Sequence, residues 1–214
     1  MTSVFEDGES KSKLAVLPDE LLLDLGGSIP RHGFNNSGDY VYRSGSELHI
    51  SGEVEIAANT VIDGRNIRLI NEAFAINNAG VALFTGVVGN SVELFTTDRH
   101  VAAPGSVFGG KTVHRFGFSM FDLNDHGRVG WYAEFTDGSD GVLIDDELVL
   151  TTGQLIDGKT ITAINSAVAI NELGQIVVRA TFSDGTVGLI SNIPEPSAVS
   201  LLVLPAAGLA RRRR

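Results

Sequence analysis

Residues 123–135 read LNDHGRVGWYAEF, and they begin with an apolar residue, an asparagine, two variable positions and a glycine. The same pattern opens FNNSGDYVYRS (34–44), INNAGVALFTG (76–86) and INELGQIVVRATF (170–182). The anchor residues of the four copies are Asn35 and Gly38, Asn77 and Gly80, Asn124 and Gly127, and Asn171 and Gly174. Consecutive anchor glycines are 42, 47 and 47 residues apart, a spacing typical of tandem structural repeats.

The residues that follow each anchor glycine alternate in the manner of a β-strand. The fourth position is bulky in every copy, and its members are Tyr42, Phe84, Trp131 and Val178. The fifth position is mostly polar, and its members are Arg43, Thr85, Tyr132 and Arg179. The sixth position is small, and its members are Ser44, Gly86, Ala133 and Ala180. We therefore expect one face of each strand to be buried, with large and small residues at matched depth.

A second landmark lies between the anchors, at Asp63-Gly64, Gly109-Gly110 and Asp157-Gly158. The next anchor glycine follows each of these pairs after 16 or 17 residues. Together with turns such as TDGSDG (136–141), these signals divide each unit into about four short strands. The sequence therefore predicts an all-β fold of tandem four-stranded repeats, similar to a β-propeller of about four blades.

The two ends of the repeat region each resemble half of a unit. KLAVLPDELLLDLGGSI (13–29) is similar to the second half, ELVLTTGQLIDGKTI (147–161), whereas GQIVVRATFSDGTVGLIS (174–191) is a first half. Pairing of these half-blades would close the ring and leave no exposed sheet edge. The alternative architecture is an open β-repeat fragment of a larger propeller.

Composition divides the chain into a polar N-terminal segment (1–12), a β-repeat domain (13–192) and a C-terminal tail (193–214). Apolar residues make up 43% and charged residues 20%, as in a folded globular protein. The chain has no cysteine, which excludes disulfides and thiolate chemistry. Residues 1–193 carry 12 basic and 25 acidic residues, a net charge of −13, so we expect no nucleic-acid partner.

The anchor asparagines are interpreted as structural, because asparagine bonds to nearby backbone and Asn-x-x-Gly makes a turn into a strand. DLNDHG (122–127) departs from a calcium-binding loop at His126. Trp131 shares its position with core residues, so it is expected to lie in the core and not to form a sugar-stacking platform. No metal, cofactor or catalytic residue is predicted, because the histidines lack ligand spacing and the acidic cluster is expected to be solvated on an acidic body. These residues are Asp137, Asp140, Asp145, Asp146 and Glu147, and His32, His49, His100, His114 and His126.

The tail reads IPEPSAVSLLVLPAAGLARRRR (193–214) and has three parts. A Pro-Glu-Pro triplet comes first, an apolar run from Ser197 to Ala210 follows, and four arginines end the chain. As a helix the apolar run would be about 21 Å long, which is short for a hydrocarbon core about 30 Å thick. The arginines would stay on the cytoplasmic side of a membrane and leave the repeats outside.

This order closely resembles the PEP-CTERM sorting signal of bacterial exported proteins. Pro194, Glu195 and Pro196 match its motif, Ser197–Ala210 match its apolar segment, and Arg211, Arg212, Arg213 and Arg214 match its basic end. The resemblance implies processing by an exosortase and a transient stage in the inner membrane, followed by release or attachment at the cell surface. The body also resembles the Asn-x-x-Gly tandem repeats that often precede such tails, a family without assigned activity.

We therefore predict an exported, surface-sorted, non-catalytic β-repeat protein that is associated with matrix or exopolysaccharide. No N-terminal export signal is visible, because Pro18, Asp19 and Glu20 interrupt the first apolar run. This departure from the PEP-CTERM pattern suggests a truncated start. The alternatives are a polysaccharide-active enzyme, with carboxylates drawn from several units of a propeller scaffold, and a truncated gene fragment.

Overall fold

The computed structural model describes residues 2–6, 9–16, 21–24, 32–164 and 168–192. These residues form β-strands and turns and no helix, which confirms the all-β prediction. The short apolar helix expected near the C-terminus falls in residues 193–214, outside the described part of the chain.

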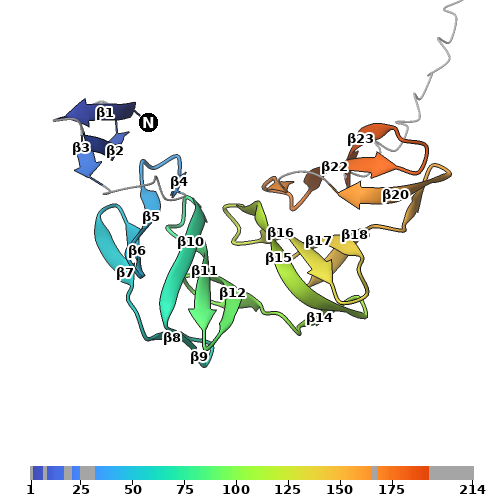
Figure 1. Cartoon of the computed structure of the whole chain (residues 1–214), viewed down its shortest axis with the longest axis horizontal. Coiled ribbons are helices and arrows are strands. Elements are labelled where there is room, and N and C mark those ends of the chain that lie inside the picture. The colour runs from blue at the N-terminus through green and yellow to red at the C-terminus, as the bar shows by residue number, and fades with distance from the viewer. Residues whose placement is uncertain (1, 7–8, 17–20, 25–31, 165–167, 193–214) are drawn as a thin grey trace, which may run out of the picture.

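Four antiparallel sheets follow one another along the chain, and Figure 1 shows them in an open arc from blue to red. The first sheet contains β4 (His32–Phe34), β5 (Tyr40–Ser44), β6 (Glu47–Ile50) and β7 (Glu53–Ile56). The second contains β10 (Leu69–Ile76), β11 (Ala82–Val88), β12 (Ser91–Thr96) and β13 (His100–Ala102). The third contains β14 (Val107–Phe108), β15 (Lys111–Leu123), β16 (Val129–Phe135), β17 (Asp140–Ile144) and β18 (Glu147–Thr151). The fourth contains β19 (Leu155–Ile156), β20 (Lys159–Ile164), β21 (Ala169–Ile170), β22 (Ile176–Phe182) and β23 (Val187–Ser191).

The paired residues of the second landmark form tight hairpin turns. Asp63-Gly64 joins β8 (Thr60–Ile62) to β9 (Arg65–Ile67), Gly109-Gly110 joins β14 to β15, and Asp157-Gly158 joins β19 to β20. All six residues have positive φ, between 48° and 78°. Two consecutive left-handed residues match the right-handed twist of the flanking strands, which explains why Asp-Gly and Gly-Gly recur there.

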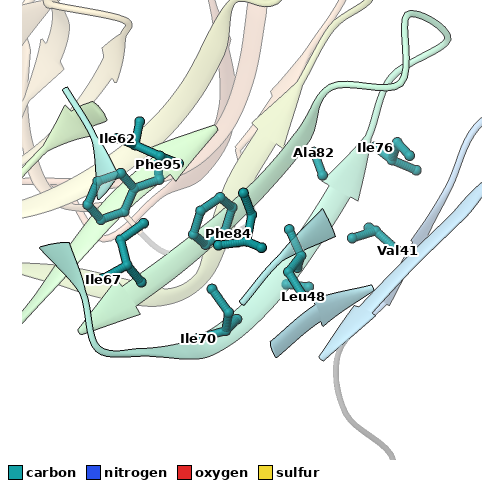
Figure 2. Close-up of a cluster of buried hydrophobic side chains, with 11 residues drawn as sticks. Val41, Leu48, Ile62, Ile67, Ile70, Ile76, Ala82, Phe84 and Phe95 are labelled. Atoms are coloured by element: carbon teal, nitrogen blue, oxygen red, sulfur yellow. The ribbon is translucent and has the colours of Figure 1, made fainter. Parts of the chain in front are cut away.

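Successive sheets pack face to face through buried apolar side chains. Figure 2 shows the cluster between the first and second sheets, which contains Val41 and Leu48 of the first sheet and Phe84 and Phe95 of the second. A second cluster joins Leu83 and Leu94 of the second sheet to the third sheet. A third cluster joins the third and fourth sheets, and its members include Tyr132, Val142, Ile144, Ile164, Ile176 and Val178.

The polar fifth position suggests that the second face of each anchor strand is exposed to solvent. This is wrong for the two middle sheets. Thr85 is only 3% exposed and Tyr132 only 7%, although both occupy the mostly polar fifth position. The fourth-position residues Phe84 and Trp131 face the preceding sheet, whereas the fifth-position side of the strand faces the following sheet. A sheet with a neighbour on both sides must bury both of its faces.

The predicted closure of the ring by pairing of the two ends is not observed in the described residues. The N-terminal strands β1 (Thr2–Glu6), β2 (Glu9–Val16) and β3 (Leu21–Asp24) form a separate three-stranded sheet. Strand β23 pairs only with β22 in the described sheets, and Figure 1 places β1–β3 at the opposite end of the arc. Among the described strands, β1 and β3 each pair with β2, so these three strands form a sheet of their own and not part of the fourth sheet.

Candidate functional site

The structure places the four Asn-x-x-Gly anchors at the turns that lead into β5, β11, β16 and β22. Within each turn the asparagine Oδ1 accepts hydrogen bonds from the backbone N–H groups two and four residues later, at 2.8–3.1 Å. All four anchor glycines have positive φ, from 74° to 90°. The asparagine therefore fixes the turn, and the glycine permits the left-handed backbone that the turn requires.

The anchor asparagines also connect one repeat to the next, which the sequence did not reveal. The Nδ2 group of Asn35 donates to the carbonyl oxygen of Asn77 at 2.9 Å. Asn77 donates in the same way to Asn124 at 3.1 Å, and Asn124 donates to Asn171 at 2.9 Å. We call this continuous chain of side-chain-to-backbone bonds the asparagine ladder.

A second row of bonds runs beside the asparagine ladder, one residue further along each turn. The backbone N–H of Asn36 donates to Oδ1 of Asn78 at 2.8 Å. The N–H of Asn78 donates to Asp125 Oδ1 at 2.8 Å, and the N–H of Asp125 donates to Glu172 Oε2 at 3.0 Å. The position after each anchor asparagine therefore needs a side-chain oxygen, which the sequence supplies as Asn, Asp or Glu.

A cleft opens between the second and third sheets, at residues that the sequence did not nominate. Its cavity volume is about 520 Å³. Phe74, Phe116 and Phe121 provide aromatic surface there, and the rings of Phe74 and Phe121 lie 4.6 Å apart. Polar groups share the lining, and they belong to Asn71, Glu72, Thr85, Asn90, Ser91 and Arg115.

An irregularity in β15 accounts for this cleft. Phe116 is paired with Ala133 and Phe121 with Trp131. Between these two pairs β15 spans five residues, whereas β16 spans only two. The shifts in the equivalent pair β10–β11 are much smaller, between Ile70 and Glu72 and between Ala73 and Ala75. The bulge in β15 bends the strand, and it lies beside the cleft.

Two carboxylates meet at a smaller hollow on the third sheet, of about 290 Å³, lined by His114, Glu134 and Asp140. Glu134 accepts a hydrogen bond from Arg115 at 2.7 Å. Asp140 accepts a hydrogen bond from the Tyr132 hydroxyl, and burial raises the pKa of Asp140. Burial likewise raises the pKa of Tyr132. Each carboxylate therefore has a hydrogen-bonding partner: Arg115 for Glu134 and Tyr132 for Asp140.

Two of the acidic residues grouped by sequence, Asp145 and Asp137, form separate ion pairs. Asp145 joins the second and third sheets, because Arg99 from the turn between β12 and β13 binds its carboxylate at 2.7 Å. Arg128 of the third sheet binds the same carboxylate at 3.1 Å. Asp137 instead pairs with Lys111 at 2.6 Å, and this contact holds the pKa of Asp137 well below its usual range. Within the part of the chain that the structure describes, no three His, Cys, Asp or Glu residues cluster as a metal site.

The calcium-loop-like segment 122–127 uses its oxygens elsewhere. Asp122 accepts the N–H of Ile170 from the fourth sheet at 2.9 Å, and burial raises the pKa of Asp122. Asn124 belongs to the asparagine ladder. Trp131 lies in the core with no exposed surface, and its Nε1–H donates to the carbonyl oxygen of Asp145 at 2.8 Å.

The sorting residues Pro194, Glu195, Pro196 and Arg211–Arg214 lie outside the described residues. Within the described residues, no helix is long and apolar enough to span a membrane. No protein-family model matches the chain, and no curated protein sequence matches it significantly.

The asparagine ladder can be tested with a substitution that changes only the donor. Asn124→Asp keeps the oxygen that fixes the turn but removes the Nδ2 donor and places a carboxylate beside the carbonyl oxygen of Asn171. We expect a loss of about 2 kcal/mol in the free energy of unfolding, measured by urea denaturation. Asn171→Asp is the matched control, because the Asn171 amide bonds only within its own turn in the described residues. Equal losses in both variants would contradict a role between repeats.

A partly buried histidine predicts a pH dependence of stability. His100 Nε2 lies 3.1 Å from a carboxylate oxygen of Glu93, whose side chain is 4% exposed. Burial lowers the pKa of His100, and Arg65 lowers it further, while Glu93 opposes the shift. Because the unfolded chain binds this proton near pH 6.5 and the folded chain only at lower pH, stability falls as pH drops below about 6.5.

Urea unfolding of the parent chain and of His100→Gln at pH 7 and pH 5 measures this effect. The variant should lose less stability on acidification than the parent, because it cannot take up the proton. The same loss in both proteins would show that His100 does not contribute.

Proposed function

We propose that this chain is an exported, surface-sorted, non-catalytic β-repeat protein that binds extracellular polysaccharide. The observation that carries the proposal is the order of the tail: Pro194-Glu195-Pro196, the apolar run 197–210, then Arg211–Arg214. An exosortase-type enzyme would process the tail during a transient stage in the inner membrane. The mature protein would then lie at the cell surface or in the surrounding matrix.

We infer further that the sheets are propeller-like blades. Support comes from their succession in an arc, from the face-to-face cores between neighbours, and from equivalent anchor turns joined by one ladder. An incomplete set of blades is compatible with the separate N-terminal sheet. In propellers and other repeat folds, ligands commonly bind where adjacent units meet.

The cleft between the second and third sheets is the proposed polysaccharide site. Rings of Phe74, Phe116 and Phe121 offer flat apolar surface for the C–H face of a sugar, while the polar side chains of Asn90 and Ser91 line the cleft beside it. A cavity of about 520 Å³ is within the usual size of small-ligand sites. The acidic body repels polyanions, so neutral polysaccharides are the favoured ligands.

Sorting is tested by expressing the chain behind a signal peptide in a bacterium with an active exosortase. We expect mass spectrometry to find cleavage near Pro194-Glu195-Pro196 and loss of the four arginines. Pro194→Ala/Pro196→Ala is the variant expected to abolish cleavage, and an exosortase-deficient strain is the control. An intact arginine end in the active strain would overturn the sorting proposal.

Ligand binding is tested by affinity electrophoresis in gels that contain neutral polysaccharides. We expect Phe121→Ala to weaken binding about tenfold, the loss that corresponds to about 1.4 kcal/mol from one aromatic contact. Val107→Ala is the matched control, because Val107 is 62% exposed and lies outside the cleft. Unchanged binding by Phe121→Ala would remove the cleft as the site.

The hollow with Glu134 and Asp140 favours the enzyme alternative, since paired carboxylates hydrolyse glycosides and a raised pKa suits a general acid. The same polysaccharide incubations should be assayed for new reducing ends. Hydrolysis that disappears in Glu134→Gln and in Asp140→Asn would establish this alternative and overturn the non-catalytic function.

A further inference from the structure

The outer face of the fourth sheet repeats a surface that is buried elsewhere in the chain. The third position after the anchor glycine faces the following sheet, and Leu83 there is fully buried in the second sheet. The equivalent residue of the fourth sheet, Val177, is 38% exposed. Leu189 and Val187 on the adjacent strand β23 are 76% and 49% exposed. Three apolar side chains are therefore exposed at this end of the arc, on a face that they share with Arg179 and Thr181.

The anchor turn of the fourth sheet has hydrogen-bond donors for which the described residues provide no acceptor in a following repeat. The Nδ2 group of Asn171 folds back to Gln175 Oε1 at 2.8 Å, whereas its three counterparts bond to the next repeat. The N–H of Asn36, Asn78 and Asp125 likewise reaches the next repeat, but the N–H of Glu172 has no hydrogen-bond acceptor among the described residues.

The opposite end of the arc presents the matching acceptors. The carbonyl oxygen of Asn35 receives only the weak bond from Gly38 N–H at 3.3 Å in the described residues, whereas the carbonyl oxygens of Asn77, Asn124 and Asn171 each accept a ladder bond. Asn36 is exposed and occupies the position whose side-chain oxygen completes the second row.

An apolar contact accompanies these polar groups. The residue before each anchor asparagine packs against the preceding sheet, so Ile76, Leu123 and Ile170 are at most 9% exposed. Ile170, for example, lies directly against Gly130, the third-position residue of the third sheet. Phe34 is the counterpart in the first repeat and is 47% exposed.

We propose that the fourth sheet docks the first anchor turn of a second copy of this chain. Asn171 Nδ2 and Glu172 N–H donate to the carbonyl of Asn35 and the side chain of Asn36 in that copy, and Phe34 packs on Val177. Deeper in the first sheet Tyr40 and Tyr42 are buried, so the contact is confined to the turn ends of the two sheets. Donors at one end and acceptors at the other make the association head to tail, which can continue into open chains.

Disulfide trapping tests this arrangement directly, because the chain contains no cysteine. Full-length Asn36→Cys and Glu172→Cys proteins are mixed and oxidised mildly, and mixed dimers are followed over time. We expect them to form at least tenfold faster than mixed dimers of Leu155→Cys with Glu172→Cys, since Leu155 is 66% exposed but lies off the docking face. Asn78→Cys/Asp125→Cys is the positive control, because those side chains are 2.6 Å apart within one chain.

Adding Val177→Lys to the Glu172→Cys copy should slow trapping to the Leu155→Cys rate. Trapping at that rate without the lysine would overturn the proposal. So would preferential Glu172→Cys homodimers, which indicate a symmetric contact, or an intramolecular bond in Asn36→Cys/Glu172→Cys at low concentration, which indicates ring closure. None of these outcomes depends on sorting or on polysaccharide binding.

Discussion

The bond from an anchor asparagine to the carbonyl of the next anchor asparagine fixes how neighbouring repeats sit relative to one another. Each such asparagine uses its oxygen to close its own turn and its nitrogen to hold the following turn. Asn77 and Asn124 are 3% and 2% exposed, so both functions are performed away from water. A buried amide that lost one partner would leave a polar group unsatisfied, which makes the position intolerant of most other residues.

The face-to-face cores follow from this fixed spacing. With the turns held in a row, the second and third sheets each have a neighbour on both sides, and apolar residues fill both gaps. Gly130 shows how close the approach is, because a Cβ atom there would come within 2.9 Å of Val168 Cγ1, which immediately precedes β21 of the fourth sheet. The cleft beside Phe116 and Phe121 occurs where a bulge in β15 interrupts this regular packing.

The periodicity of the sequence identified the all-β fold, the turn positions and the burial of Trp131, because these depend on residues close together in the chain. It could not show that Thr85 and Tyr132 are buried, since alternation along a strand does not reveal what covers its second face. The ladder was missed for a related reason: its partners are 42 or 47 residues apart, and only the stacking of repeats brings them together. The pairing of Asp145 with Arg99 also depends on that stacking.

The asparagine ladder also sets how the protein would respond to tension. Among the described residues the repeats pack mainly against their neighbours, so the resistance of two repeats to separation is the sum of one interface and one pair of turn bonds. If the chain is held at a surface through its C-terminal tail, a pulling force acts first on the fourth sheet. The outer face of that sheet exposes Val177, Val187 and Leu189. The force would then act on the interfaces one after another. The molecule would therefore lengthen in steps, and the inner repeats would stay folded while the outer repeats separate.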